Sequence, residues 1–432
     1  MTRKELDVVI AGQHAGVLSQ DASGSLSFQY LRGYRGVPLS SAMPLSTQSY
    51  RDKIVLPYLW GLLPEDSATR KHIAAESGIS PNNPFALLGV IGLDCPGAVQ
   101  FCPRGSDTAQ EERLVPMSET DIAHRLSLGR NESSSWIAAN EHWSLGGQQS
   151  KFALRNQNDA WFSCEGAAAT THILKSGVKG LAHQALNEYV CMRLARECGI
   201  NAAKIEYREF KSENSIEPAI VIKRYDRLVA KGSVVRLHQE DLCQALGCLP
   251  DNKYAMYGGP NCADVLKLLT STGPTAQANA ASFLQMLFFN YLLAATDAHA
   301  KNYSLMLSAD GAHRLAPMYD VAPMAPYIES TQWEIKPPKL AMSIGGENRV
   351  GHLSKENLAK LVDQCNLEKL GITAEGCAKL ICFYADTIPE KLASIFDGFE
   401  ETQADSASKE LRTRLETPIV QLCAKTKTQL MA

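Results

Sequence analysis

The spacing of apolar residues changes along the chain and divides it into a strand-rich part and a helix-rich part. Before about residue 240, short runs alternate apolar and polar positions between Gly, Pro and polar residues, which is typical of β-strands and turns. Later, apolar residues recur every three or four positions over longer segments, as in amphipathic helices. We therefore expect a mixed α+β protein whose strands come mainly first.

The first 110 residues are predicted to form a subdomain of their own. The elements predicted there are a hairpin of Leu6–Ala11 and Gly16–Leu18, and helices over Tyr50–Leu62 and Ser67–Glu76. Pro57 falls inside the first helix and is a candidate break. The segment Gly105–Arg113 is polar and acidic, so we expect it to be an exposed connection to the next domain.

The rest of the chain is predicted to form two lobes. Residues 111–238 should form a strand-rich lobe with strands Phe152–Arg155, Thr171–Lys175, Ile205–Phe210 and Ala219–Lys223 around one helix, Leu186–Cys198. Residues 239–432 should form an all-helical lobe with helices Gln239–Leu246, Ala263–Leu269, Ala278–Ala295, Glu356–Gln364, Ala374–Ser394 and Ser406–Lys425. Ligands commonly bind in the cleft of such a two-lobed architecture.

Composition and charge exclude several classes of protein. The chain has 432 residues, 45% of them apolar and 21% charged, which argues against a disordered protein. The net charge of −3 argues against a protein that mainly binds nucleic acid. The longest apolar stretch, Ala280–Ala295, is too short for a membrane span and is interrupted by polar residues, and the N-terminus does not resemble a signal peptide. None of the 12 cysteines forms a Cys-x-x-Cys pair, so we expect a reduced, cytoplasmic protein without a zinc ribbon.

The segment Thr296–Asn302 carries the strongest chemical signal. Phosphoryl transfer uses a carboxylate that accepts the proton of the attacking hydroxyl, and oxygen ligands that hold magnesium beside the phosphates. Asp297 and Asn302 have the spacing of the base and the metal-binding Asn in a kinase catalytic loop. A predicted hairpin of Tyr303–Leu307 and Arg314–Ala316 follows and leads to Asp320, a second candidate magnesium ligand. Asp297 and Asn302 alone would also fit an ordinary capped loop.

Three further segments fit a nucleotide site. Gly146 and Gly147, before Lys151, would let a backbone loop approach phosphates closely, although neither the Walker pattern nor the kinase glycine pattern is present. Lys175 ends a strand and is followed by a helix with Glu188, the kinase arrangement that grips the α- and β-phosphates. Lys223–Tyr225 falls where the lobes would join, so its backbone is expected to bind adenine, with Tyr225 stacking on the ring.

These segments, taken in order, resemble the HipA-type serine/threonine kinases, the toxin halves of bacterial HipBA toxin–antitoxin pairs. In the N-terminal part the matching segments are Gly61–Asp66, Pro84–Leu88 and Gly97–Val99. In the kinase part they are Ser144–Lys151, Thr171–Lys175, Asn187–Tyr189, Tyr225–Arg227, Gln239–Gln244, Thr296–Asn302 and Tyr319–Asp320. The resemblance spans nearly the whole chain and implies a two-lobed, protein-kinase-like fold with an extra N-terminal subdomain.

The resemblance also implies roles for individual residues. Asp297 is similar to the catalytic base, Asn302 and Asp320 to the magnesium ligands, and Ser144 to the serine whose autophosphorylation silences the kinase. The ATP-binding residues that it implies are Gly146, Gly147, Gln148, Gln149, Ser150, Lys151, Lys175, Lys223, Arg224, Tyr225, His299, Ala300, Lys301, Asn302, Tyr319 and Asp320. A phosphate dianion on Ser144 would repel the ATP phosphates nearby.

The partners implied by the family are a HipB-type helix-turn-helix antitoxin dimer, operator DNA and a translation protein such as glutamyl-tRNA synthetase. Phosphorylation of that target would favour growth arrest and persistence. The chain departs at Ala298 and Lys223 from one related member of the family, which has Gly and Glu there. Few basic residues fall near Ser343–Lys355, so we expect operator DNA to be bound mainly through the antitoxin.

Two other functions fit part of the same pattern. A small-molecule phosphotransferase uses the same Asp, Asn and Asp set. A non-catalytic corepressor or pseudokinase would bind the antitoxin and a nucleotide but transfer nothing. The presence of both Asp297 and Asn302 argues against the corepressor, because a pseudokinase tends to lose these residues.

Overall fold

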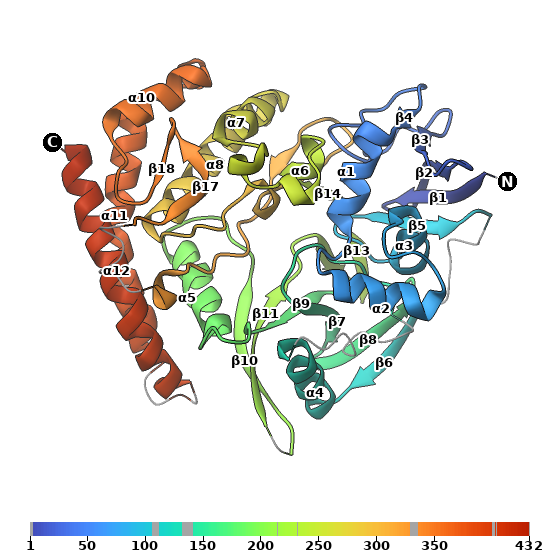
Figure 1. Ribbon diagram of the computed structural model, residues 1–432, viewed down its shortest axis with the longest axis horizontal. Coiled ribbons are helices and arrows are strands. Elements are labelled where there is room, and N and C mark those ends of the chain that lie inside the picture. The colour runs from blue at the N-terminus through green and yellow to red at the C-terminus, as the bar shows by residue number, and fades with distance from the viewer. Residues whose placement is uncertain are drawn as a thin grey trace. The chain divides into compact units, whose positions relative to one another are not determined.

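The chain folds into two compact units in the computed structural model (Figure 1). The structure describes residues 3–105, 112–131, 141–213, 215–230, 232–328, 336–399, 402 and 404–431. Unit 1 comprises Met1–Lys179, Glu206–Asp251 and Ser304–Ala316, and unit 2 comprises Gly180–Ile205, Asn252–Tyr303 and Pro317–Ala432. The predicted catalytic loop therefore lies in unit 2, and the predicted phosphate-binding segments lie in unit 1.

Unit 1 contains most of the strands. A five-stranded sheet of order β4-β3-β2-β1-β5 is formed by β1 Lys4–Ile10, β2 Gln13–Gln20, β3 Leu26–Tyr30, β4 Tyr50–Arg51 and β5 Val99–Pro103. A six-stranded sheet of order β10-β11-β9-β7-β8-β6 is formed by β6 Glu112–Met117, β7 Lys151–Gln157, β8 Ala160–Gly166, β9 His172–Ser176, β10 Ile205–Lys211 and β11 Ile216–Lys223. Two smaller sheets are formed by β12 Arg227–Ala230 with β13 Ser233–Arg236, and by β14 Gln239–Asp241, β15 Ser304–Met306 and β16 Arg314–Leu315.

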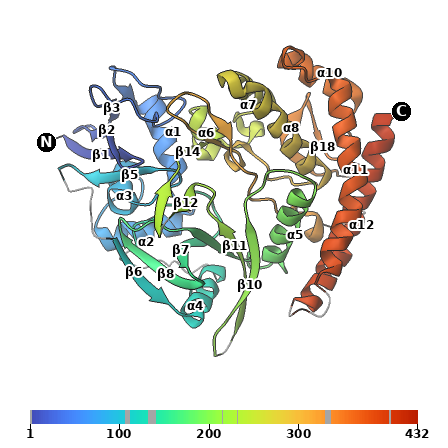
Figure 2. The same ribbon diagram turned by 180° about the vertical axis from the view of Figure 1, so that it is seen from behind.

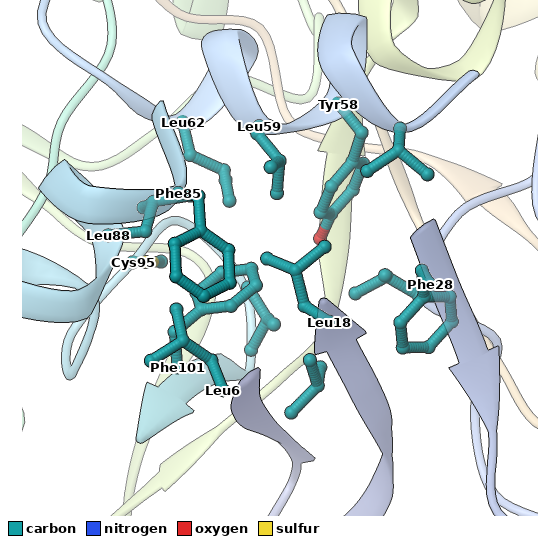
Figure 3. Close-up of a cluster of buried hydrophobic side chains, with 14 of the residues drawn as sticks. Leu6, Leu18, Phe28, Tyr58, Leu59, Leu62, Phe85, Leu88, Cys95 and Phe101 are labelled. Atoms are coloured by element: carbon teal, nitrogen blue, oxygen red, sulfur yellow. The ribbon is translucent and has the colours of Figure 1, made fainter. Parts of the chain in front are cut away.

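Helices pack on these sheets and close two apolar cores. The helices of unit 1 are α1 Asp52–Leu62, α2 Ser67–Ser77, α3 Pro84–Ile91, α4 Glu119–Arg130 and the short α6 Leu242–Ala245. The first core joins the five-stranded sheet to α1 and α3 and includes Leu18, Phe28, Tyr58 and Leu59 (Figure 3). The second joins the six-stranded sheet to α4 and includes Phe152, Leu154, Leu174 and Val221. Burial of such side chains is the main stabilising term of each unit.

Unit 2 is dominated by helices, as the periodicity predicts. They are α5 Gln184–Glu197, α7 Cys262–Thr270, α8 Ala276–Leu292, α10 Lys355–Gln364, α11 Ala374–Asp397 and α12 Asp405–Met431. The long helices α11 and α12 run side by side (Figures 1 and 2). A short hairpin of β17 Lys339–Ile344 and β18 Glu347–Arg349 adds strands to this helical unit, which the sequence does not predict. Among the described residues, no helix is both long and apolar enough to cross a membrane.

Most predicted elements are present with shifted ends, but one helix prediction is partly wrong. The segment Gln239–Leu246 begins as strand β14, which pairs with β15, and becomes helical only at Leu242 because Asp241 caps α6. Pro57 lies inside α1 without ending it. Of the predicted connection Gly105–Arg113, Ser106–Glu111 lie outside the described residues, and Glu112 and Arg113 begin β6.

Candidate functional site

Helix α8 ends just before the predicted catalytic loop. The helix stops at Leu292 because Ala294 adopts a left-handed conformation, with φ of 51°, and the N–H of Ala295 returns to the carbonyl of Asn290 at 2.9 Å. Left-handed backbone is costly for alanine, so its presence at a helix end that leads into a site indicates a locally constrained turn. The buried amide of Asn290 donates to the hydroxyl of Tyr303 at 2.9 Å and so ties the end of α8 to the far end of the loop.

Asp297 and Asn302, predicted from their spacing, are brought together within this loop. The backbone oxygen of Asp297 accepts from the N–H of His299 at 2.8 Å and from Nδ2 of Asn302 at 2.9 Å. The Asp297 side chain is 65% exposed, so its carboxylate is accessible to a second molecule. Because Nδ2 of Asn302 is used within the loop, its amide oxygen Oδ1 is the atom that remains for a cation.

Asp320 is fixed by the segment that precedes it. Met318 pairs with the chain near Ala202, since its N–H donates to the carbonyl of Asn201 at 2.8 Å and its carbonyl accepts from Ala203 at 2.9 Å. The hydroxyl of Tyr319 donates to the backbone oxygen of Lys301 at 2.9 Å and thereby attaches this segment to the catalytic loop. Asp320 itself has φ of 62°, an unusual conformation for a residue with a side chain and one that is concentrated at functional sites.

The oxygen atoms of this loop suit a hard cation that also binds phosphate. Among the residues that the structure describes, no group of three or more His, Cys, Asp or Glu side chains could hold a metal by itself. Magnesium normally keeps several waters and is held by one or two protein oxygens plus substrate phosphates. Asn302 and Asp320 therefore stay the predicted ligands of a magnesium ion that would arrive with a nucleotide.

The other loop residues are mostly buried. His299 and Lys301 are 3% and 8% exposed, and Ala300 is fully buried at the start of a short 3₁₀ turn, Ala300–Asn302. The imidazole of His299 lies 3.9 Å from the Asp297 carboxylate. The fold therefore holds the imidazole of His299 close to the carboxylate and buries the side chain of Lys301.

Unit 1 places two predicted lysines directly opposite each other. Lys151 on β7 pairs with Lys175 on β9 in the antiparallel register, so both side chains project from the same face of the sheet. Lys175 is 5% exposed and Lys151 is partly exposed. A phosphate near both lysines would offset the repulsion between their like charges, and their contacts with the phosphates of ATP stay a prediction. The sequence does not show that the two lysines are opposed, because the register of β7 and β9 is not encoded locally.

The glycine-rich loop is held beside this pair. Gly147 has φ of 101°, a backbone conformation that favours glycine, and a side-chain carbon there would lie 2.5 Å from Nζ of Lys151 and displace the amine. The carbonyl of Gly147 accepts from the N–H of Glu65 at 3.1 Å, and Nε2 of Gln149 donates to the carbonyl of Ser176 at 2.7 Å. Gln148 is exposed, and Gly146 and Ser150 are partly exposed.

Ser144 lies at the start of this loop and is fully buried. Its hydroxyl donates to the carbonyl of Leu62, at the end of α1, at 2.6 Å, and its N–H donates to the carbonyl of Asp94 at 3.1 Å. The segment Gly61–Asp66 thus receives a structural role: Leu62 and Glu65 hold the loop, and Asp66 caps α2. A buried serine must leave this position before it can accept a phosphate.

The segment Lys223–Tyr225 is only partly free for a nucleotide. The N–H of Arg224 donates to the carbonyl of Thr171 at 2.9 Å, and its guanidinium is buried in ion pairs with Asp94 and Asp226. The hydroxyl of Tyr225 donates to the side chain of Gln239. Internal contacts therefore use the N–H and the guanidinium of Arg224. The contacts of Lys223, Arg224 and Tyr225 with adenine stay a prediction.

One predicted pair concerns both units. Lys175 belongs to unit 1, whereas Glu188 is fully buried in helix α5 of unit 2. Their ion pair stays a prediction.

The chain is similar to known proteins over nearly its whole length. Two family models match the chain, the HipA N-terminal domain over residues 6–102 and the HipA-like C-terminal domain over residues 143–392. The Sinorhizobium fredii protein named "Putative kinase Y4mE" is 30% identical over 94% of this chain and 95% of its own length. The Shewanella oneidensis protein named serine/threonine-protein kinase toxin HipA is 29% identical over 91% of this chain and 89% of its own length.

A solved structure supports the same relationship. It is the Shewanella oneidensis MR-1 toxin–antitoxin system of HipA, HipB and its operator DNA, and it matches with a TM-score of 0.76 and 26% identity over 98% of this chain and 99% of that chain. The match covers both units. The predicted kinase-like α+β fold is confirmed.

Proposed function

Because the chain belongs to the HipA family, whose members include toxin kinases, we propose that it is an ATP- and magnesium-dependent protein serine/threonine kinase. The observation that carries the proposal is the loop in which Asn302 returns to Asp297 while Tyr319 attaches Asp320 to the same loop. The base and the cation ligands are then available from the catalytic loop and the segment attached to it, as phosphoryl transfer requires. The opposed lysines of unit 1 add a site for the phosphates of ATP.

The proposed reaction needs few groups from the protein. The hydroxyl oxygen of the acceptor serine attacks the γ-phosphorus, its proton passes to the Asp297 carboxylate, and the bond from the γ-phosphorus to the ADP oxygen breaks. Lys151 and Lys175 hold phosphate oxygens and offset their charge. Asn302 and Asp320 would hold magnesium, which neutralises charge on the phosphates when it is bound.

The test is transfer of radiolabel from γ-labelled ATP to proteins of a bacterial extract. We expect labelled protein bands with the wild type and a loss of about 1,000-fold or more with Asp297→Asn, which keeps the shape of the side chain but cannot accept the proton. Equal labelling by both proteins would overturn the assignment of Asp297. Labelling of hydroxylated small molecules, without protein bands, would favour a small-molecule phosphotransferase.

We propose that Ser144 is the site of silencing autophosphorylation. Its buried hydroxyl, bound to the Leu62 carbonyl, supports this role because a phosphate dianion could not stay in that position. Phosphorylation would therefore detach the loop from α1 and remove Gly147 and Lys151 from the nucleotide. The loss of one loop would be enough to stop transfer.

We also propose a HipB-type antitoxin and operator DNA as cytoplasmic partners, with DNA bound mainly through the antitoxin. The matching Shewanella oneidensis structure is a complex of HipA with HipB and its operator DNA, which supports this proposal. The net charge of this chain is −3, and Arg349, the arginine of the segment Ser343–Lys355, is paired with Glu347 at 2.6 Å. Two experiments would test this role. The chain should co-purify with a helix-turn-helix protein encoded by an adjacent gene, and a gel shift of operator DNA should need both proteins.

The acceptor protein is the finer part of the proposal. Glutamyl-tRNA synthetase is the first candidate, because family resemblance implies a translation protein. Labelled ATP, purified synthetase and this chain test it directly, with Asp297→Asn as the control. Labelling of other extract proteins without labelling of the synthetase would replace this candidate and leave the kinase assignment intact.

A further inference from the structure

A tyrosine far from the predicted catalytic loop in sequence contacts the candidate base. The hydroxyl of Tyr254 donates to Oδ1 of Asp297 at 2.5 Å. Both residues belong to unit 2, so the contact lies within one compact body. Among the described residues, this hydroxyl is the one side-chain donor that reaches the Asp297 carboxylate within hydrogen-bond distance.

The tyrosine is held firmly in this position. Its ring meets the ring of His299 edge-on, with centroids 5.0 Å apart, and meets Tyr257 edge-on at 6.1 Å. The carbonyl of Tyr254 accepts the N–H groups of Tyr257 and Gly259 at 3.0 and 3.1 Å, which closes the turn behind the ring. Nζ of Lys253 lies 5.7 Å from the ring centroid. The ring is therefore fixed by its own turn and by the catalytic loop.

Glycine at position 259 keeps this turn compact. A side-chain carbon there would lie 1.8 Å from the backbone oxygen of Asn252, so no larger residue fits without opening the turn. The turn also lies against strand β17 of the same unit. A rigid support of this kind is what a precise catalytic geometry needs, because small displacements of a base are costly for transfer.

The carboxylate itself lacks such support without Tyr254. The Asp297 side chain is 65% exposed, and an exposed aspartate samples several rotamers. A short hydrogen bond between a hydroxyl and a carboxylate is among the stronger ones in proteins. With Oδ1 bound to Tyr254, the other oxygen, Oδ2, is held in one direction and remains available to accept a proton.

We propose that Tyr254 is a positioning residue for phosphoryl transfer, which holds Oδ1 of Asp297 so that Oδ2 accepts the proton of the acceptor hydroxyl. The inference rests on the kinase function proposed above. Tyr254 acts through Asp297 and does not contact the phosphates. Its loss should therefore lower the rate of transfer while leaving nucleotide binding unchanged, since the hydroxyl contributes only to the orientation of the base.

The test compares Tyr254→Phe with wild type, with Asp297→Asn and with Tyr257→Phe. Tyr257 is 64% exposed and belongs to the same turn, so its variant removes a tyrosine hydroxyl at a matched position. Initial rates of labelling of one extract protein are measured over a range of ATP concentrations, together with the Kd for a fluorescent ATP analogue. We expect Tyr254→Phe to lower kcat by about 10- to 100-fold with unchanged KM for ATP and unchanged Kd.

Each outcome decides one question. If the wild type labels nothing, the kinase function fails, whatever Tyr254 does. If wild type is active and Tyr254→Phe matches it, or is faster, the positioning role is overturned; a faster variant would mean that the hydroxyl blocks the acceptor site. A rise in KM and Kd together with lost thermal stability would also overturn it, because the tyrosine would then support the fold rather than orient the base.

Discussion

Asp94 and Arg227 form an ion pair of 2.8 Å between Oδ1 and Nη2, although their side chains are only 3% and 0% exposed. Asp94 follows helix α3, and Arg227 begins β12, so the pair joins distant parts of unit 1. Arg224 and Thr170 also donate to Asp94, at 3.1 and 2.7 Å. Burial by itself would raise the pKa of Asp94, but the guanidinium groups of Arg227 and Arg224 outweigh it and hold that pKa below its ordinary value.

The first prediction is that Asp94→Asn strongly destabilises unit 1. Arg224, Arg227 and Arg236 would then lose the carboxylate of Asp94 as their partner. Removal of one member of a buried ion pair costs about 3–5 kcal/mol of stability, because it leaves the other charge buried without compensation. Urea unfolding measures the change. The matched control is Glu375→Gln, which breaks the fully exposed Glu375–Lys379 pair and should leave the midpoint unchanged. A small effect of Asp94→Asn would mean that the cluster does not stabilise the fold.

The second prediction concerns pH. Burial raises the pKa of Glu240 to about 7, even though Ser40 Oγ and the N–H of Ser41 donate to its oxygens at 2.5 and 2.7 Å. The folded protein therefore binds this proton more tightly than the unfolded chain. The protonated form of Glu240 therefore stabilises the folded protein by about 3 kcal/mol relative to the ionised form. This stabilisation is fully present below pH 4.5 and is lost as the pH rises through about 7.

Glu240→Gln isolates this contribution because glutamine has the same shape and no titrating proton. Between pH 4.5 and pH 7.5 the wild type should lose unfolding free energy relative to Glu240→Gln, so the variant gains stability relative to the wild type over this range. Measurement of urea midpoints at several pH values gives the curve. A difference that stays constant over this range would show that the pKa of Glu240 is not raised.

The third prediction concerns Ser144. Incubation with ATP and magnesium should add one phosphate to wild type, and Ser144→Ala should abolish this mass shift. Peptide mapping is needed because Ser150 lies in the same loop. Hydrogen exchange of the backbone near Leu62 and Gly147 should increase after phosphorylation, since the 2.6 Å contact of Ser144 with the Leu62 carbonyl would be lost. A full mass shift in Ser144→Ala would place the modification at another residue.

The fourth prediction tests the opposed lysines. ATP at 100 times its Kd should stabilise wild type by about 2.7 kcal/mol, or a rise in Tm of about 5 °C. Lys175→Met should remove most of this rise, because one of the two cations facing the phosphates is lost. Lys179→Met is the control, since Lys179 is exposed a few residues after the same strand. An unchanged rise in Lys175→Met would exclude the pair from the nucleotide site.

The sequence by itself determined the features that depend on neighbouring residues. The alternation of apolar and polar positions predicts the strands of unit 1, and the helical period predicts α8, α11 and α12, because local periodicity sets which face is buried. The spacing of Asp297 and Asn302 predicts a loop in which the two meet, since five residues limit how far the chain can travel. The ends of helices were less predictable. Helix α8 stops at Leu292 because Ala294 adopts the left-handed conformation, whereas a glycine, the usual sign of such a helix end, is absent there.

Only the tertiary structure decided the contacts between distant residues. The register of β7 and β9 sets Lys151 against Lys175. Packing in unit 1 uses the N–H and the guanidinium of Arg224, and the turn at Tyr254 reaches Asp297 across 43 positions of the chain. Such contacts form only when whole helices and strands pack into the native structure, so no local sequence pattern encodes them. The residues that carry the chemistry are local in sequence, and the residues that orient them are not.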